Sequence, residues 1–284
     1  MAGSDSGSEP DSVADGGRPF RIALGFEYDG GAYNGWQSQP HAPSVQETLA
    51  AAATRVANED VSVIGAGRTD TGVHATLQVA HFDTHAERSE ESWRRGINTH
   101  LPDDINVHWA RPVSHDFHAR FSATARAYRY LILNRKSMSA LDRNRVWSVT
   151  YDLDLEAMQK AAECLAGKHD FSSFRASSCQ AHTPVRTMSH VSLSKEGSCI
   201  LFDIRGDAFL HHMVRNLMGT LVTVGRGDKP ASWVAEVLEA RDRKLAGITA
   251  PPQGLYLTDV TYPDEFGLPK GGWAIEAATR YMHT

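Results

Sequence analysis

The sequence predicts an α+β protein of two similar halves joined near residue 113, with helices on one face of antiparallel sheets. A strand, helix, strand, strand order recurs in both halves, although no residue-level repeat accompanies it. Short hairpins join the strands, so the strands are expected to pair antiparallel. The helices are then expected to cover one face of each sheet. The 284 residues, of which 41% are hydrophobic, are enough for a substantial core.

The first half is expected to hold four strands and two helices. The strands lie at residues 20–30, 61–67, 76–84 and 105–113, and the helices lie at residues 44–59 and 88–98. Alternating apolar residues and a closing Asp-Gly-Gly turn predict the first strand. Ser44 followed by Glu47 forms a capping box at the start of the first helix, whose Ala and Leu content favours helix.

The second half is expected to combine further strands with three helices. The strands lie at residues 125–134, 190–209 and 254–263, and the helices lie at residues 153–169, 211–227 and 229–242. Aromatic and β-branched residues support the first of these strands. The stretch 190–209 is a hairpin that turns at Glu196 and Gly197, and Gly167 stops the helix that precedes it.

The charge pattern divides the chain into a leader and two domains. Residues 1–19 are expected to form a disordered acidic leader, because they are rich in Gly, Ser and Asp. Residues 20–113 and 114–284 are expected to form N-terminal and C-terminal α+β domains. The leader holds four acids and one base, so it leaves −2 of the formal charge of −5 on the rest of the chain. A nearly neutral body does not indicate nucleic-acid binding, although local clustering of charge could provide it.

The cysteines and the hydropathy exclude several classes of protein. Cys164, Cys179 and Cys199 are odd in number and widely spaced, so neither a disulfide framework nor a zinc ribbon is expected. No apolar run approaches the ~20 residues needed to cross a bilayer. The N-terminus lacks the apolar core of a signal peptide. We therefore expect a cytoplasmic protein with no membrane partner.

The stretch GAGRTDTGVHA, residues 65–75, places Asp70 between glycines. Because glycine loses the most backbone freedom on folding, a loop pressed close to a neighbour is favoured over a helix or strand. One interpretation of Asp70 is an Asx-turn, bonded to nearby backbone N–H groups. The other is a carboxylate that Arg68 keeps ionised and that serves as a nucleophile or general base.

Two further stretches interleave aromatic residues with amides or arginines. In residues 30–40, Tyr33 and Trp36 either stack on bases or cover the core. Residues 116–132 hold basic and aromatic residues in alternation, namely Arg120, Arg126, Tyr128, Arg129 and Tyr130. This interleaving indicates RNA binding, whereas the alternative is core tyrosines beside solvated arginines.

The stretch AFLHHMVRNLMG, residues 208–219, predicts the start of an amphipathic helix, with Arg215 four residues after His211 on one face. An Arg among apolar residues needs an anionic partner if it is buried, and Asp70 is the candidate. A metal site is not expected, because two adjacent His residues cannot both point at one ion from a helix.

Several of these stretches resemble the motifs of the TruA family of tRNA pseudouridine synthases. They are EYDGGAYNGWQSQ, GAGRTDTGVHA, DFHARFSATARAYRY, HDFSSFR, HHMVRN and GLYL, in the family's order over about residues 20 to 265. The resemblance implies two halves whose sheets join across a deep basic cleft, and a homodimer. It also implies that uridines at positions 38, 39 and 40 of the tRNA anticodon stem-loop become pseudouridine, with neither a cofactor nor a metal.

The resemblance further implies roles for individual residues. Asp70 matches the nucleophile, Arg68 the residue that enters the RNA, and Tyr128 the residue that packs on the flipped uracil. Arg215 matches the partner of the carboxylate, and Leu255 lines the uracil pocket. Contacts with tRNA are expected at Arg88, Phe117, His118, Ala119, Arg120, Phe121, Lys136, Ser178, Cys179, Gln180, Ala181 and His182. A uracil stacked in a helix hides its reacting atoms, so it must be extruded.

Four residues depart from the family pattern, namely Thr71, Ala75, Leu77 and Ala127. Ala75 would be strained if its position required a positive φ. Ala127 interrupts a run of arginines, which removes one expected phosphate contact. Two rival functions stay open: a tRNA-binding module without catalysis, and a metal-dependent hydrolase of a nucleotide or phosphoester.

Overall fold

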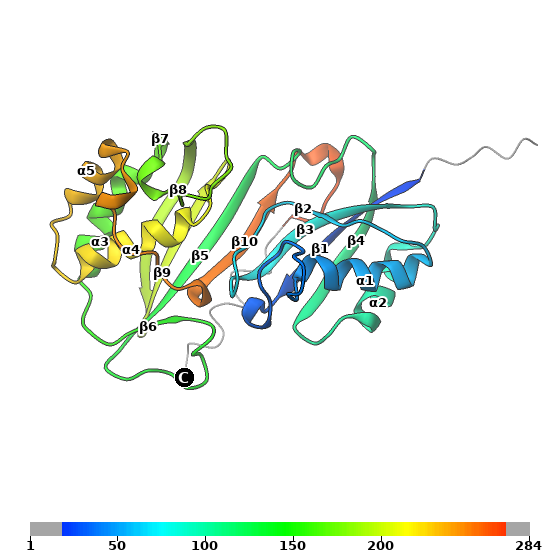
Figure 1. Ribbon diagram of the computed structural model, residues 1–284, viewed down its shortest axis with the longest axis horizontal. Helices are drawn as coiled ribbons and strands as arrows, with labels where there is room; N and C mark the ends of the chain where they lie inside the picture. Colours follow the sequence, from blue (N-terminus) through cyan, green and yellow to red (C-terminus); the bar gives the residue numbers. More distant parts are fainter. Residues whose placement is uncertain (1–18, 271–284) are drawn as a thin grey trace, which may run out of the picture.

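The computed structural model describes residues 19–270, and one ten-stranded sheet runs along its length (Figure 1). Its strands are β1 (Phe20–Tyr28), β2 (Ile64–Gly65), β3 (His74–Thr84), β4 (Ile105–Val113), β5 (Ala125–Asn134), β6 (Trp147–Val149), β7 (Gly167–Asp170), β8 (Val185–Glu196), β9 (Cys199–Gly206) and β10 (Leu255–Thr261). The main path is β4-β1-β3-β10-β5-β9-β8-β7, with β2 paired to β3 and β6 to β5. Only the β10–β3 and β5–β6 pairs are parallel, so the predicted α+β class with a mostly antiparallel sheet is confirmed.

Five α-helices pack against this sheet within the described residues. They are α1 (Val45–Ala57), α2 (Glu90–His100), α3 (Leu155–Ala162), α4 (Met213–Gly225) and α5 (Trp233–Ala240). The predicted cap of α1 is present, because Ser44 Oγ accepts the N–H of Glu47 at 3.2 Å. Within the described residues, no helix has the length and apolar character that crossing a membrane requires.

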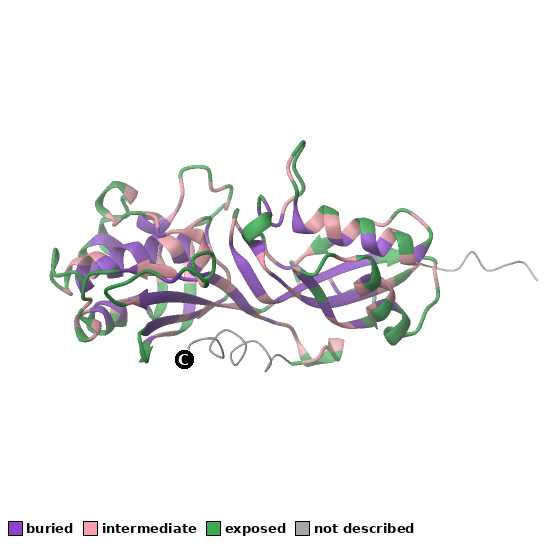
Figure 2. Cartoon of the chain, turned by 90° about the horizontal axis from the view of Figure 1, so that it is seen from below, coloured by how far each residue is buried: buried purple, intermediate pink, exposed green. Residues whose placement is uncertain are grey.

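The buried side chains form two large apolar clusters on the helix side of the sheet. One contains residues of α1 and α2, and the other contains residues of α3, α4 and α5. Leu257 belongs to the first cluster and Leu255 to the second, and these neighbours on β10 project to the same face. Both helix layers therefore cover one face at the centre of the sheet, and Figure 2 shows the buried residues gathered on the strands and the inner sides of the helices.

Four elements differ from the sequence-based expectation. The strand predicted at residues 61–67 is limited to β2. The helix predicted at residues 153–169 ends at Ala162 and continues as a short 3₁₀ turn. Gly167 then adopts a φ of 94°, a left-handed conformation that directs the chain into β7, where it pairs with β8. Both β6 and β7 were absent from the prediction.

Strand β10 connects the N-terminal and C-terminal parts of the chain. It lies between β3 and β5, pairing Tyr256 with His74 on one side and Leu255 with Tyr130 on the other. The sheet is therefore continuous across residue 113, and the division into two domains there stays a prediction. The predicted acidic leader lies outside the described residues, apart from Pro19.

Candidate active site

Asp70 lies in the loop between β2 and β3, and its side chain is 21% exposed. The residue before it anchors the loop: Thr69 is buried, and its Oγ1 lies 2.8 Å from the hydroxyl of Tyr28. A second segment of the chain also holds the loop, because the backbone N–H of Trp36 donates to the carbonyl oxygen of Thr69 at 3.0 Å. A Cβ on Gly35 would stand 2.5 Å from the same oxygen, so this close approach requires glycine.

The carboxylate of Asp70 contacts side chains that lie far along the chain. Arg215 Nη1 donates to Oδ2 at 2.9 Å, while Arg215 Nε donates to the carbonyl of Ala250 at 2.8 Å. His211 Nε2 lies 3.2 Å from Oδ1, and His212 Nε2 lies 3.4 Å from Oδ2. The expected pairing of Arg215 with Asp70 is therefore present. Arg215, rather than the exposed Arg68, supplies the guanidinium beside this carboxylate.

The two histidines reach Asp70 because they precede α4 instead of belonging to it. His212 is the N-cap and has a φ of 62°, so the backbone turns left-handed between the two rings. The ring centroids lie 4.0 Å apart, and the nearest ligand atoms of Asp70, His211 and His212 all lie within 4.8 Å of one another. The argument that adjacent His residues cannot converge was therefore wrong. The Arg215 guanidinium nevertheless places a fixed positive charge at this cluster.

Tyr128 forms the apolar side of the site. It is half-buried on β5 between the two apolar clusters, and its ring meets Phe209 edge-on at a centroid distance of 4.8 Å. Burial raises the pKa of Tyr128 to about 12, and the charge of Asp70 acts in the same direction. Leu255 is buried on the same face of the sheet. A carboxylate, an aromatic ring and an aliphatic wall therefore lie close together, which suits a planar base.

The segment 176–182 lies next to this carboxylate through His211. Ser178 Oγ lies 3.1 Å from His211 Nδ1, and His211 N–H donates to Cys179 Sγ at 3.4 Å. Burial alone would raise the pKa of the Cys179 thiol, but hydrogen bonds from Ala181, His211 and the Arg175 guanidinium bring it below its ordinary value. The segment is therefore tied to the site, while Ser178, Gln180 and His182 remain exposed.

Comparisons with known proteins match most of this chain. The family model described as tRNA pseudouridine synthase matches residues 26–122 and 161–263. A tRNA pseudouridine synthase A of Pseudoalteromonas atlantica is 57% identical over 251 residues, covering 88% of this chain and 95% of that protein. Its counterpart from Shewanella amazonensis is 56% identical, covering 88% and 96%. The chain belongs to the tRNA pseudouridine synthase family.

Among solved structures, a chain of the crystal structure of a Cbf5-Nop10-Gar1 complex aligns with a TM-score of 0.34 and 12% identity. The alignment covers 83% of this chain and 48% of that chain.

The structure divides the family's expected tRNA-contact residues into exposed and buried groups. In the stretch 117–121, Phe117 and Ala119 are fully buried, so their side chains belong to the core. Arg120 is exposed, Phe121 is 75% exposed, and His118 packs against the Phe121 ring at a centroid distance of 4.4 Å. Side chains of His118, Arg120 and Phe121 are therefore the ones available to RNA.

Two arginines that were grouped with the RNA-binding pattern have structural contacts instead. Arg129 is buried and paired with Asp203 at 2.7 Å. The Arg126 guanidinium donates to the backbone carbonyls of Ala66, close to the loop that carries Asp70, and of Arg120. Burial lowers the pKa of Arg126. The position of this side chain shows that it joins loops instead of facing solvent.

Tyr33 and Trp36 also belong to the core, since both are buried and the Trp36 ring packs on Gly65. Of their two interpretations, covering the core is the one that the structure supports. Arg88 and Lys136 are exposed but lie away from Asp70: Arg88 contacts Val56 of α1, and Lys136 pairs with Asp152 at 2.8 Å.

The family departure at Ala75 causes no strain. Ala75 lies within β3, opposite Tyr28, and it is absent from the residues with positive φ. Sequence reasoning missed the contacts of His211 and His212 with Asp70, and it missed Phe209 beside Tyr128. No residue pattern signals Phe209, because its position depends on how the chain leaves β9.

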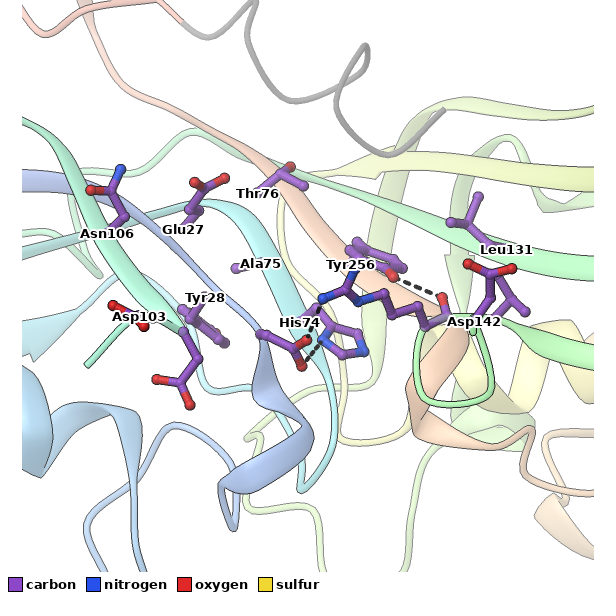
Figure 3. Close-up of a pocket in the computed structure, with 14 residues that line it drawn as sticks. Glu27, Tyr28, His74, Ala75, Thr76, Asp103, Asn106, Leu131, Asp142 and Tyr256 are labelled. Atoms are coloured by element: carbon purple, nitrogen blue, oxygen red, sulfur yellow. Dashed lines mark hydrogen bonds and ion pairs between the residues drawn. The ribbon is translucent and has the colours of Figure 1, made fainter. Parts of the chain in front are cut away.

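A hollow of about 440 Å³ lies on the opposite face of the sheet (Figure 3). Its lining includes Leu131 and Tyr256, whose chain neighbours Tyr130 and Leu255 face the helices. Five acidic residues line it, namely Glu27, Asp29, Asp103, Asp104 and Asp142. His74 stacks on Tyr256 there at a centroid distance of 4.8 Å. Asp70, Arg215 and Tyr128 are not part of this hollow.

Proposed function

We propose that this chain isomerises uridines at positions 38 to 40 of the tRNA anticodon stem-loop to pseudouridine, with Asp70 as the nucleophile. Membership of the family makes the chain an isomerase that acts on tRNA. The observation that carries the finer proposal is the placement of Asp70: its carboxylate is partly exposed, held by Arg215, and next to Tyr128. An anionic oxygen kept beside a guanidinium is available for attack.

The reaction breaks the N1–C1′ bond and forms a C5–C1′ bond. The hydrogen on C5 leaves as a proton and N1 gains one, so no net oxidation or reduction occurs. Asp70 can act by attack at C1′, by attack at C6, or as the base that starts elimination at the ribose. Each route requires the uracil to leave its stack, which costs a few kcal/mol. Arg68, exposed at the tip of the same loop, suits insertion into the RNA, and Tyr128 suits stacking on the released base.

The surface charges support docking of tRNA on the helix side of the sheet. Arg68 and Arg120 are exposed on loops near the site, and Ser178, Gln180 and His182 are exposed on the segment next to it. The hollow on the other face is lined by five acidic residues and one arginine, Arg145, which pairs with Asp29, so its net negative charge would repel phosphate groups. Arg88 and Lys136 extend the proposed contact to more distant parts of a large substrate. The proposal includes a homodimer and a cytoplasmic location, as the family resemblance implies.

The test is to map pseudouridine in an unmodified tRNA transcript incubated with the protein in EDTA. Wild type is expected to form pseudouridine at positions 38 to 40, and Asp70→Ala and Asp70→Asn are expected to form none. Asp103→Asn, an exposed acid on the opposite face, is the matched control and should retain activity. Unchanged product from Asp70→Asn would show that Asp70 is not the nucleophile. A wild type that binds tRNA without forming pseudouridine would favour the non-catalytic binding module, and hydrolysis that EDTA abolishes would favour the metal-dependent hydrolase.

A further inference from the structure

The two oxygens of Asp70 are held from two different sides. Arg215 donates to Oδ2 and is itself braced by the carbonyl of Ala250. Oδ1 faces His211, whose Nε2 lies 3.2 Å away. His212 approaches Oδ2, the oxygen that Arg215 already holds, at the longer distance of 3.4 Å. His211 is therefore the side chain that controls Oδ1.

We infer that His211, oriented by Ser178, is a positioning residue that aligns Asp70 and couples this carboxylate to the segment 176–179. The inference rests on the proposed role of Asp70 as nucleophile. It adds a function for a histidine that needs no metal, and it gives the exposed segment a way to act on the reacting oxygen.

The contacts of His211 fix its backbone to the segment 176–179. The N–H of Ala176 donates to His211 O at 3.0 Å, and His211 N–H donates to Cys179 Sγ at 3.4 Å. Arg175 Nη2 donates to the carbonyl of Cys179 at 2.6 Å, which braces the segment from behind. A shift of this segment must therefore move the imidazole as well.

The ring nitrogens of His211 have complementary partners. An ionised carboxylate only accepts, so the proton belongs on Nε2, which faces Asp70. Nδ1 is then the acceptor for the hydroxyl of Ser178, 3.1 Å away. The hydroxyl thus selects both the tautomer and the rotation of the ring. Removing it leaves the imidazole free to turn its acceptor nitrogen toward the carboxylate.

The contact at Oδ1 is loose enough for substrate to tighten it. Catalytic contacts are often long before substrate binds and shorten in the complex. Ser178, Gln180 and His182 are exposed on the same segment, where RNA can reach them. When RNA binds to this segment and shifts it, Ser178 and the His211 backbone move the imidazole relative to Oδ1 of Asp70. The nucleophile is consequently best aligned when tRNA is seated.

The test measures single-turnover kcat and tRNA Kd separately for variants of the full chain. His211→Ala is expected to lower kcat on the order of 10- to 100-fold, the cost of a misplaced reacting group, with Kd within about twofold of wild type. Ser178→Ala is expected to lower kcat about 2- to 10-fold, as for one lost hydrogen bond. The double variant should be no slower than His211→Ala, because both residues act through one path. Ser178→Thr and His211→Gln, which keep a hydroxyl and an N–H donor, should regain most of the rate.

Controls separate this inference from the function itself. His190→Ala removes an exposed histidine on β8 and should match wild type in both constants. Wild type and Asp70→Ala are assayed together: an inactive wild type would overturn the proposed function, whereas an active wild type equalled by His211→Ala would overturn only the inference. A loss confined to Kd, or additive losses in the double variant, would also overturn it. Because Ser178→Ala and His211→Gln remove few atoms, they keep the test decisive if His211→Ala fails to fold.

Discussion

At the scale of single residues, Asp70 depends on partners that other elements bring to it. Thr69 is locked against Tyr28, so the loop presents its next residue outward toward α4. Arg215 is tied at two atoms, one on Asp70 and one on Ala250. A charge-assisted hydrogen bond from a guanidinium that is also fixed to Ala250 keeps the carboxylate in place.

We predict that Arg215→Gln lowers kcat about 10- to 100-fold, since a hydrogen bond to a charged group contributes about 1.5 to 3 kcal/mol. Arg215→Lys should give an intermediate rate, because an ammonium keeps the charge but cannot reach both Asp70 and Ala250 with planar geometry. The measurement is single-turnover pseudouridine formation. Arg226→Gln, at the other end of α4, is the control and should match wild type. Equal rates for wild type and Arg215→Gln would contradict the prediction.

The partners of Asp70 were only partly predictable. A buried Arg needs an anion, which made Asp70 a candidate partner for Arg215, but only the family resemblance paired the two residues. The approach of His211 and His212 could not be foreseen, because it depends on the left-handed backbone at His212. Histidine adopts that conformation seldom, and no neighbouring residue signals it.

At the scale of elements, β3 holds the loops around the site through buried polar side chains. His81 on β3 is buried, and its Nδ1 accepts the N–H of Ala119 at 3.2 Å. This bond fixes the stretch that presents Arg120 and Phe121. Burial lowers the pKa of His81 to about 4, and the nearby Arg21 and His118 charges act in the same direction. A neutral ring is required, because a protonated Nδ1 cannot accept.

We predict that stability falls between about pH 6.5 and pH 4 because His81 must be neutral in the fold. Over this range His81 is protonated in the unfolded chain but neutral in the folded chain, so the free energy of unfolding declines as pH falls. His81→Asn keeps an acceptor for Ala119 and cannot be protonated. Chemical denaturation at pH 7 and pH 4.5 should show the wild type losing about 1 to 3 kcal/mol more than the variant. Identical losses would show that His81 is not responsible.

Every strand and helix expected from the sequence has a counterpart, but the ends and the short strands were missed. The C-terminal end predicted for the helix at 153–169 was wrong, because Gly167 begins strand β7 instead of ending a helix. Strands β6 and β7 are too short to carry a periodic pattern of their own. They form because the neighbouring edges of β5 and β8 offer free hydrogen-bonding groups.

At the scale of the whole molecule, the two faces of the sheet differ in charge near the centre. Arg68, two residues before Asp70, and Arg120 are both exposed, whereas the hollow on the other side is lined by five acidic residues and by Arg145. A chain with a formal charge of −5 can therefore still offer a cationic surface to RNA. Which strands pair across the centre could not be predicted, because a local pattern does not specify the partner of a strand such as β10.

We predict that tRNA affinity decreases steeply with salt, because each neutralised phosphate releases counterions. Arg120→Gln should reduce the slope of log K against log salt by about 1, as expected for one lost phosphate contact. The measurement is filter binding over a salt series with Asp70→Ala protein, which under the proposed mechanism leaves the substrate unconverted. Arg143→Gln, an exposed cation near the acidic hollow, serves as the control. A flat salt response would contradict a clustered cationic face.

The position of β10 also governs how the protein must be made. The ribosome synthesises β3 and β5 long before β10, the strand that lies between them in the sheet. The edges of β3 and β5 that pair with β10 therefore have unpaired backbone groups during translation. Chains truncated before Leu255 would lack the aliphatic side chain near Tyr128 and would expose the unpaired edges of β3 and β5. Such fragments are candidates for aggregation and proteolysis, and catalysis starts only when synthesis has passed this strand.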